Sequence, residues 1–257
     1  MIELQGISKQ FGPEGPPAID GLDLAIAAGE VMVLIGESGS GKTTTLRMIN
    51  RLAEPSSGTI RIDGQDATTA DPVTLRRHMG YVFQGVGLFP HMTVGENVAI
   101  TPRLLGWDKP RIAARVTELL ALVRLPVEQY RDRYPAELSG GQRQRIGLAR
   151  ALAAEPHIML MDEPFGALDP LTRDDLATDF LQIHRELKLT TVLVTHDMTE
   201  AFMLGDRVAV MRDGKIAQIG TPQDLAANPA DDFVRTLIET PRRRARELAA
   251  IMQAGPA

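Results

Sequence analysis

The feature that most constrains this chain is a continuous apolar run, Val31–Ile35, that leads directly into a loop rich in glycine. A run without polar alternation predicts a strand buried on both faces of a parallel sheet. From about Lys42 to Leu52 the pattern changes to that of a helix. A buried strand, a glycine-rich loop and a helix in this order predict an α/β fold with a phosphate-binding turn at a strand end.

The loop between this strand and helix has the chemistry of phosphate binding. Its glycines let backbone N–H groups turn inward around phosphate oxygens, and the helix N-terminus adds a favourable dipole. Lys42 is expected to bring a positive charge to the β- and γ-phosphates, and the Thr43 hydroxyl to bind Mg²⁺. The alternative is a coincidental Gly/Ser loop, and the flanking strand and helix argue against it. The loop residues are Gly36, Glu37, Ser38, Gly39, Ser40, Gly41, Lys42 and Thr43.

Composition sets the broad class of the chain. Its 257 residues are 44% hydrophobic and 24% charged, the balance of an ordinary folded protein. The absence of cysteine excludes disulfides, thiolate metal sites and a cysteine nucleophile. A net charge of −5, spread along the chain, argues against a dedicated nucleic-acid binder. No apolar run approaches the roughly 18 residues of a membrane span, and the first residues do not resemble a secretory signal.

The rest of the chain divides into strand-rich and helix-rich parts. The first 28 residues read as strands on either side of a Pro/Gly loop. A helix over about 171–187 connects two apolar strands, which implies a right-handed parallel crossover. Helical periodicity dominates from about His91 to Leu152, as expected of an inserted helical subdomain. Further strands are expected at residues 59–62, 79–83, 158–161 and 192–195, with two more within 207–219.

An acidic pair ends one of these strands. Asp162 and Glu163 follow the apolar run 158–161, at the strand edge where α/β sheets place ligands. Asp162 suits binding of Mg²⁺, and Glu163 suits polarising an attacking water as general base. The alternative is a helix-capping or solvated acid. The phosphate loop upstream favours the functional interpretation.

Three further polar features complete the set. Ser139 is a good N-cap for a helix rich in Arg and Ala, and the adjacent glycines would let the backbone approach a ligand closely. The alternative is an ordinary capped helix start. Gln84 and His196 each follow a predicted strand. Either is also compatible with a structural polar residue at a strand end, but both are expected at the same sheet edge as the phosphate loop.

In combination and order, these motifs resemble the ATP-binding subunit of ABC transporters over residues 2–240. The resemblance implies a P-loop NTPase core with a mainly parallel sheet, an N-terminal antiparallel β subdomain and an inserted α-helical subdomain at about residues 91–152. Residues 241–257 are then a short helical tail. ATP and Mg²⁺ are the implied ligands.

The resemblance also assigns roles to residues. The Walker A loop is Gly36–Thr44. The Phe11 ring takes the place of the aromatic side chain that stacks on adenine. The alternative is that Phe11 is a core residue of a strand. Thr43, Gln84 and Asp162 would bind the metal. The remaining assignments are Ser139, Gly140, Gly141 and Gln142 to the signature motif, Gln84 to the Q-loop, Asp162 to Walker B, Glu163 to the catalytic glutamate, Asp169 to the D-loop and His196 to the switch histidine.

Family members work in assemblies, which gives expectations about partners. The resemblance implies a head-to-tail homodimer in which the signature motif of one subunit covers the ATP of the other. It implies two integral-membrane permease subunits that contact the stretch Gly85–Asn97, and no nucleic acid. Leu88 and Phe89 in that stretch would be interface residues or, alternatively, subdomain core. The protein would then lie at the cytoplasmic face of the plasma membrane and act indirectly with an extracytoplasmic solute-binding protein.

Several strings point to one branch of the family. Residues 43–52, 87–93, 104–107, 130–135 and 228–234 resemble importers of quaternary-amine osmoprotectants such as glycine betaine, choline, carnitine or proline betaine. Some members carry a regulatory domain after the cassette, and this chain, ending at Ala257, is expected to lack it. Arg242, Arg243, Arg244 and Arg246 form a solvated basic helix face or, alternatively, rest near anionic lipid.

Other functions compete with import of an osmoprotectant. An importer ATPase for a different small polar solute keeps every motif above. A soluble ABC ATPase acting on nucleic acid or ribosomes usually has two cassettes, a coiled-coil insert or zinc-binding cysteines, and this chain shows none of these features. A nucleotide-binding scaffold without hydrolysis conflicts with the presence of Glu163 and His196.

Overall fold

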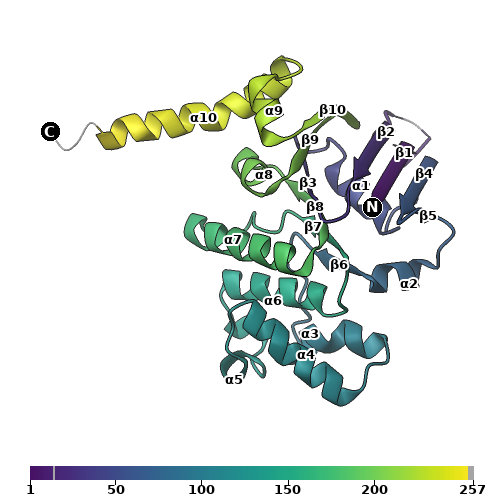
Figure 1. The fold of residues 1–257 in the computed structure, drawn as a ribbon, viewed down its shortest axis with the longest axis vertical. Helices are drawn as coiled ribbons and strands as arrows, with labels where there is room; N and C mark the ends of the chain where they lie inside the picture. Colours follow the sequence, from purple (N-terminus) through teal and green to yellow (C-terminus); the bar gives the residue numbers. More distant parts are fainter. Residues whose placement is uncertain (14, 254–257) are drawn as a thin grey trace.

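The apolar strand β3 (Val31–Gly36) lies inside a six-stranded sheet with every residue buried. The computed structural model describes residues 1–13 and 15–253 and orders this sheet β10-β9-β3-β8-β7-β6 (Figure 1). All neighbours pair in parallel except β9 and β10, which form an antiparallel hairpin. The other strands are β6 (Met79–Val82), β7 (Ile158–Asp162), β8 (Thr190–Thr195), β9 (Arg207–Arg212) and β10 (Lys215–Gly220).

The side chains of β3 divide between two hydrophobic cores. Val31, Val33 and Ile35 pack into one core, which extends into the helical part of the molecule. Met32 and Leu34 pack into the other core, on the opposite face of the sheet. Because successive side chains of a strand point to opposite faces, only an unbroken apolar run satisfies both cores. The predicted double burial of this strand is therefore confirmed.

The second core is closed by an N-terminal antiparallel sheet. Its strand order is β2-β1-β4-β5, and β1 pairs with both β2 and β4. Apolar residues of β1 and β2 alternate toward this core, as in a sheet with one buried face. The four strands are β1 (Ile2–Lys9), β2 (Ile19–Ile26), β4 (Ser57–Ile62) and β5 (Gln65–Asp66).

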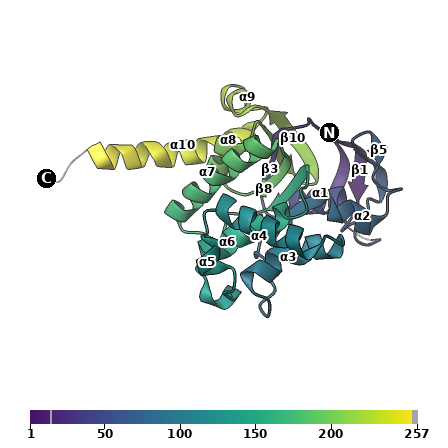
Figure 2. The same ribbon diagram turned by 60° about the horizontal axis from the view of Figure 1, so that its bottom comes forward.

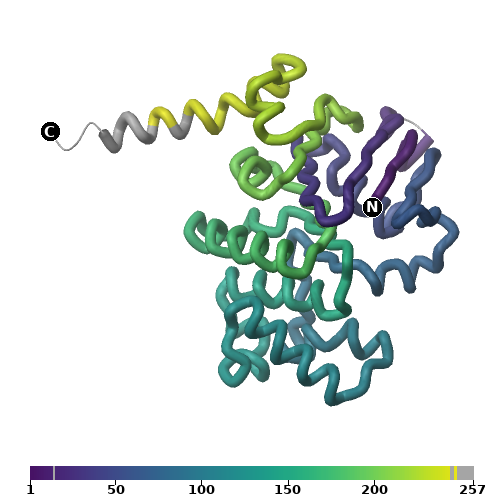
Figure 3. The backbone as a smooth tube through the Cα atoms, in the orientation of Figure 1, coloured from purple at the N-terminus to yellow at the C-terminus, as the bar shows by residue number. Residues whose placement is uncertain are grey.

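Helices between β6 and β7 form a separate part at one end of the molecule (Figures 1 and 2). Their starts carry strong N-caps: Thr93 and Ser139 form capping boxes, and the Asp108 carboxylate accepts from the Arg111 amide. The trace in Figure 3 passes from the N-terminal strands to this part and back to the central sheet. The elements are α3 (Val94–Leu104), α4 (Lys109–Leu122), α5 (Val127–Tyr130), the 3₁₀ turn η1 (Pro135–Glu137) and α6 (Gly140–Leu152).

The other helices lie against the two sheets or continue the chain beyond them. Helix α1 ends at Ile49, short of the predicted Leu52, because Asn50 caps it and Arg51 adopts a left-handed φ of 56°. The helix α2 was not predicted; Asp71 caps it, with proline at its start. These helices are α1 (Lys42–Ile49), α2 (Pro72–Arg77), α7 (Pro170–Leu187), α8 (Met198–Leu204), α9 (Pro222–Ala227) and α10 (Asp232–Gln253).

Helix α10 runs without a break through residue 240, where the predicted tail begins. Among the basic residues noted there, Arg242 and Arg243 are exposed, and Arg243 forms an exposed ion pair with Glu247. The Arg244 side chain and residues 254–257 lie outside the described part of the chain. None of the helices in residues 1–13 and 15–253 is both long enough and apolar enough to span a bilayer.

One buried histidine ties α7 to the start of β3. The His184 ring contacts the Thr191 hydroxyl at 3.0 Å and the Gly29 carbonyl at 3.2 Å. Burial lowers the pKa of His184 below its ordinary value of 6.5. The neutral ring, with one nitrogen donating and the other accepting, matches both partners.

We expect this histidine to make folding sensitive to acid. Below its ordinary pKa the unfolded chain binds a proton that the folded protein resists, so stability falls as the pH decreases. The slope from this one group is at most about 1.4 kcal/mol per pH unit. Denaturation midpoints at about pH 7.5 and about pH 5.5 should differ less in His184→Gln than in the wild type. His157→Gln, at an exposed position, should retain the full difference.

Candidate functional site

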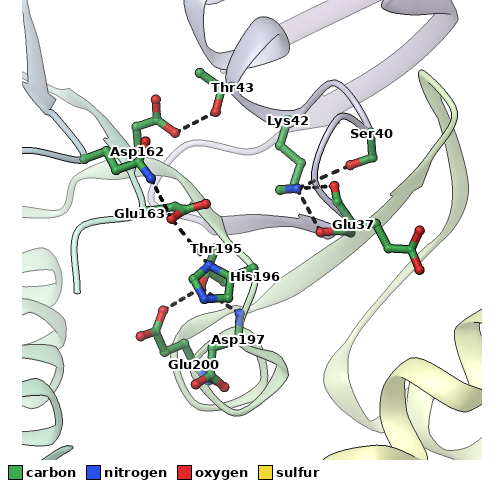
Figure 4. Close-up of polar contacts among 12 residues, drawn as sticks. Glu37, Ser40, Lys42, Thr43, Asp162, Glu163, Thr195, His196, Asp197 and Glu200 are labelled. Carbon is green, nitrogen blue, oxygen red and sulfur yellow. Dashed lines mark hydrogen bonds and ion pairs between the residues drawn. The ribbon is translucent and has the colours of Figure 1, made fainter. Parts of the chain in front are cut away.

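The polar residues selected from the sequence follow parallel strands at one edge of the central sheet. The register pairs Ile35 with Thr195, and Asp162 with Val194. Gly36, Glu163 and His196 therefore emerge side by side, and Gln84 follows β6 at the same edge. Parallel strands end together, so residues far apart in sequence meet there. Figure 4 shows this edge.

The glycine-rich loop wraps around the Lys42 ammonium. Its Nζ donates to the carbonyls of Gly36 at 2.8 Å and Glu37 at 2.7 Å, and lies 3.4 Å from the Ser40 hydroxyl. The Glu37 carboxylate points away from the ammonium (Figure 4). Burial lowers the pKa of Lys42, while the charges of Glu163 and Asp162 oppose that shift. The loop thus holds a desolvated positive charge inside a ring of its own oxygens.

Two loop glycines are required by close backbone approach. A Cβ at Gly36 would lie 2.1 Å from the Met211 carbonyl oxygen. Gly41 has φ +100°, and a Cβ there would meet the Ala18 carbonyl oxygen at 2.7 Å. Gly39 also has positive φ, at +84°, but a Cβ at this position would have no neighbouring atom within 4 Å. The loop is therefore packed tightly on one side and open on the other.

The first residues of α1 meet the acidic end of β7. The Thr43 hydroxyl donates to Asp162 Oδ1 at 2.9 Å. Burial raises the pKa of Asp162, and the hydrogen bond from Thr43 opposes the shift. Tyr81, a polar residue in the apolar strand β6 that sequence inspection missed, lies beside this carboxylate; burial and the Asp162 charge raise its pKa to about 12. A hydroxyl and a carboxylate side by side are the hard oxygen ligands that Mg²⁺ prefers.

Two predicted residues converge on a carboxylate oxygen of a third, Glu163. Gln84 Nε2 donates to Glu163 Oε2 at 3.0 Å, and His196 Nδ1 lies 3.4 Å from the same atom. Glu163 adopts a left-handed φ of 46°, and its amide donates to the Val194 carbonyl at 2.9 Å. A glutamate rarely adopts this conformation, which costs on the order of 1 kcal/mol or more. The packing at the end of β7, including the bond to Val194, therefore holds Glu163 in this conformation.

A network behind His196 was not recognised from the sequence. The Thr195 hydroxyl donates to Glu200 Oε2 at 2.6 Å and accepts from the Asp197 amide at 3.0 Å. Arg173, near the start of α7, lies 3.4 Å from the Asp197 carboxylate. Burial raises the pKa of Glu200, and its bond from Thr195 opposes this. The sequence does show polar residues close to His196, namely Thr195, Asp197 and Glu200. Their partner Arg173, however, lies on α7, more than twenty residues earlier in the chain.

The predicted signature residues do not join this cluster. The Ser139 hydroxyl accepts from the Gln142 amide at 3.2 Å, and Gln142 Oε1 accepts from the Ser139 amide at 2.9 Å. Gly140 and Gly141 begin α6, which packs on α3, α4, α7 and β6, whereas α1 packs on β3, β7 and β8. Both ribbon views place α6 and α1 in different parts of the molecule (Figures 1 and 2). The structure therefore confirms the capped helix start and separates it from the phosphate loop.

Phe11 and Asp169 are placed in distinct settings. Phe11 lies beyond the end of β1 and is 71% exposed, so the alternative of a core phenylalanine is wrong. The Ala18 amide donates to the Lys9 carbonyl, which closes the hairpin loop that contains Phe11, and the Lys9 ammonium lies 5.0 Å from the centre of the Phe11 ring. The Asp169 carboxylate accepts from the Thr172 amide at 3.1 Å and caps α7, and hydrogen bonds from Thr172 lower the Asp169 pKa.

A groove borders the stretch that follows Gln84. Phe89 is 39% exposed, whereas Leu88 is partly buried against the main core, so the core alternative fits Leu88 and not Phe89. The groove has a volume of about 430 Å³ between β6, α3 and α6. Its apolar lining includes Met79, Tyr81, Phe83, Phe89, Ile100 and Leu104.

Comparison with known proteins defines the family. A family profile described as ABC transporter matches residues 19–166, more than half of the chain. The chain is 51% identical to the osmoprotectant import ATP-binding protein OsmV of Salmonella typhimurium, over 96% of this chain and 66% of that protein. It is 54% identical to the glycine betaine/carnitine/choline transport ATP-binding protein OpuCA of Bacillus subtilis, over 93% of this chain and 62% of that protein.

The fold agrees with this assignment. The dimeric ATP-binding cassette MJ0796, in a post-hydrolysis state bound to ADP and Pi, superposes with a TM-score of 0.78. It shares 33% sequence identity and covers 86% of this chain and 99% of its own. The chain belongs to the ABC transporter family, as the motif pattern predicted. It spans less than two thirds of the length of the relatives OsmV and OpuCA.

We expect Gly41→Ala to destabilise the protein more than Gly39→Ala. Both substitutions carry the cost of a positive φ, but only the methyl group at Gly41 meets backbone. The additional loss in unfolding free energy should be about 1–3 kcal/mol, the usual cost of overpacking. Urea denaturation of the two variants measures it. Equal stability would mean that the loop does not pack against Ala18 as described.

Proposed function

We propose that this chain binds and hydrolyses ATP as the energy-coupling subunit of an importer. The observation that carries the proposal is the convergence of Gln84 and His196 on the Glu163 carboxylate. This carboxylate lies at the same sheet edge as a glycine-rich loop that encloses a buried lysine. A general base beside a phosphate cradle is the arrangement that hydrolysis of a nucleoside triphosphate needs.

The glycine-rich loop and the start of α1 would bind the phosphates. The loop carbonyls that now accept from Lys42 would release its ammonium to phosphate oxygens, where its charge stabilises the transition state. Thr43 and Asp162 fit Mg²⁺, since their oxygens already lie 2.9 Å apart, and Gln84 completes the proposed set. The metal, when bound, neutralises charge that develops on the phosphates.

Glu163 is the proposed base. Its Oε2 is shared by the Gln84 amide and the His196 ring, so the carboxylate is held at the sheet edge rather than free to rotate. From there it orients a water for attack on the terminal phosphorus and accepts the proton of that water. The strained φ of Glu163 fits this role, because strained backbone is concentrated at functional sites.

A second copy of the chain would complete each site. Ser139 and its glycines begin a helix whose amides suit an anion, but the helix lies away from the phosphate loop of the same chain. A two-fold dimer supplies each copy with the signature motif of the other. The similarity to a dimeric cassette supports this arrangement. Phe11, which is exposed, would be available to stack on adenine, and Asp169 would meet the partner at the dimer interface.

The groove beside Phe89 is the proposed docking site for permease subunits. Its lining combines the exposed aromatic side chains of Phe83 and Phe89 with Arg76, a mixture that suits a short amphipathic helix of a membrane protein. Through such permeases the chain would work at the cytoplasmic face of the membrane. The groove lies directly after Gln84, so movement of a docked helix reaches the Glu163 site through a few residues.

The proposed solute is a quaternary-amine osmoprotectant. The relatives OsmV and OpuCA are named for import of osmoprotectants and of glycine betaine, carnitine and choline. Identities of 51% and 54% to these two proteins support the same solute class for this chain. The solute would be delivered to the permeases by an extracytoplasmic binding protein.

Replacing the proposed base should separate binding from hydrolysis. In Glu163→Gln the amide still contacts Gln84 and His196 but cannot accept the proton of the water, so kcat should fall by a factor of about 10² or more. ATP affinity should stay close to that of the wild type. Phosphate release and nucleotide titration measure the two quantities, and uptake of labelled glycine betaine by cells carrying the transporter should fall with kcat.

Two further variants serve as comparisons. Lys42→Ala removes the charge of the phosphate loop and should weaken ATP binding itself. Glu186→Gln, at an exposed position of α7, should change neither quantity. Hydrolysis by Glu163→Gln at the wild-type rate would refute the assignment of the base.

A crosslinking experiment tests the permease surface. The chain contains no cysteine, so a single introduced thiol reports one position. Phe89→Cys should form crosslinks with permease loops in the assembled transporter, because Phe89 is exposed at the groove. Leu187→Cys, exposed at the end of α7, should not. Equal crosslinking of both positions would argue against a defined docking groove.

A further inference from the structure

We propose that Arg173 is a positioning residue that ties the turn before α7 to the start of α8, which directly follows His196. The inference rests on the proposed function, because it concerns how the Glu163 site is held for hydrolysis. Arg173 lies in the first turn of α7, four residues after the helix cap Asp169. None of the sequence motifs includes it.

The guanidinium of Arg173 faces three acceptors in two segments, the turn before α7 and the start of α8. Its Nη2 donates to the Leu168 carbonyl at 3.1 Å, within the turn that precedes α7. Its Nη1 donates to the Asp197 carboxylate at 3.4 Å. Its Nε faces Glu200 Oε1 at 3.7 Å. A planar group with five fixed donors is suited to linking three acceptors, which a lysine ammonium on a flexible stem does less well.

Arg173 contacts the start of α8, which directly follows His196. Thr195, just before His196, donates to Glu200, and the Asp197 amide, just after it, donates back to the Thr195 hydroxyl. Asp197 also caps α8 by accepting from the amides of Thr199 and Glu200. Figure 4 shows His196 between Thr195 and Asp197, with Glu200 to one side of this turn. The ring of His196 is therefore carried by a turn that Arg173 contacts directly at Asp197 and reaches at Thr195 only through Glu200.

One contact in this network is incomplete. Arg173 Nε and Glu200 Oε1 are both buried, and within the described residues neither has a hydrogen-bond partner. They face each other 3.7 Å apart, so an approach of less than about 1 Å would form a charged hydrogen bond. Glu200 is only 7% exposed, and burial raises its pKa, as expected of a carboxylate whose counter-charge is not in full contact. Motion of the turn before α7 toward the His196 turn would close this gap.

This geometry predicts an effect on turnover rather than on binding. Arg173 touches neither the phosphate loop nor Glu163 directly; it acts through the turn that carries His196. Loss of its guanidinium frees that turn and leaves a buried carboxylate without its partner. Binding of ATP by the loop around Lys42 does not involve these contacts.

The test compares Arg173→Met with Arg185→Met. Methionine keeps the aliphatic stem and removes the charge, and Arg185 is exposed on the same helix. We expect Arg173→Met to lower kcat for ATP about tenfold, which corresponds to about 1.4 kcal/mol in the barrier, with KM changed less than about twofold. Arg185→Met should match the wild type. Arg173→Lys, which keeps the charge and fewer of the contacts, should fall between the two.

A second mutation identifies the path of the effect. Glu200→Gln keeps an oxygen to accept from Thr195 but needs no counter-charge. If Arg173 acts through Glu200, the double variant Arg173→Met/Glu200→Gln should recover part of the lost kcat. A double variant whose losses simply add would overturn this path.

Hydrogen exchange provides a readout that does not depend on activity. The Asp197 amide is bonded to Thr195 within the turn that Arg173 contacts. In Arg173→Met without nucleotide, exchange across residues 195–198 should be faster than in the wild type and in Arg185→Met. Unchanged exchange, or a kcat of Arg173→Met equal to that of Arg185→Met in an active wild-type background, overturns this inference alone. A wild-type chain that does not hydrolyse ATP overturns the proposed function together with it.

Discussion

Burial of β3 on both faces is the constraint on which the rest of the structure depends. Its alternate side chains supply two cores, one shared with the helical part and one with the antiparallel sheet. Because the strand cannot move without disturbing both cores, the loop that leaves its end at Gly36 starts from a fixed point. The same packing fixes the parallel neighbours, whose ends present Asp162 and Thr195 at one edge. A rigid sheet edge of this kind can hold a glutamate in a strained backbone conformation.

Charge at this edge is arranged in a desolvated setting. Burial lowers the pKa of Lys42 and raises that of Asp162, so each group is held in a medium that penalises its charge. Such groups interact strongly with any phosphate or cation that enters, because little water competes with them. Behind the site, Glu200 is also a buried charged group, and it contacts Thr195 and faces Arg173. There it serves to hold a turn rather than to meet a ligand.

The central sheet and the helical part carry different residues of the proposed site. The sheet edge carries the phosphate loop and Glu163, while the helical part carries Ser139 on a separately capped helix. Between them runs the groove with Phe89, adjacent in sequence to Gln84. A chain built in this way has a capped helix start at α6 apart from the phosphate loop and a partly apolar groove, and both would suit the proposed partners. Membership of the ABC transporter family is consistent with each of these features.

The sequence by itself determined the local elements and the residues of the site. The apolar run, the glycine loop and the polar residues after strands are signals carried by neighbours in the chain, so Gly36, Gln84, Glu163 and His196 can be identified from the sequence alone. Tertiary structure decided what depends on contacts between distant segments. Phe11 proved exposed rather than core, Leu88 and Phe89 differ in exposure, and Arg173 on α7 faces Glu200 on α8 at 3.7 Å. Those outcomes follow from packing and from the way parallel strands align their ends, which no local pattern encodes.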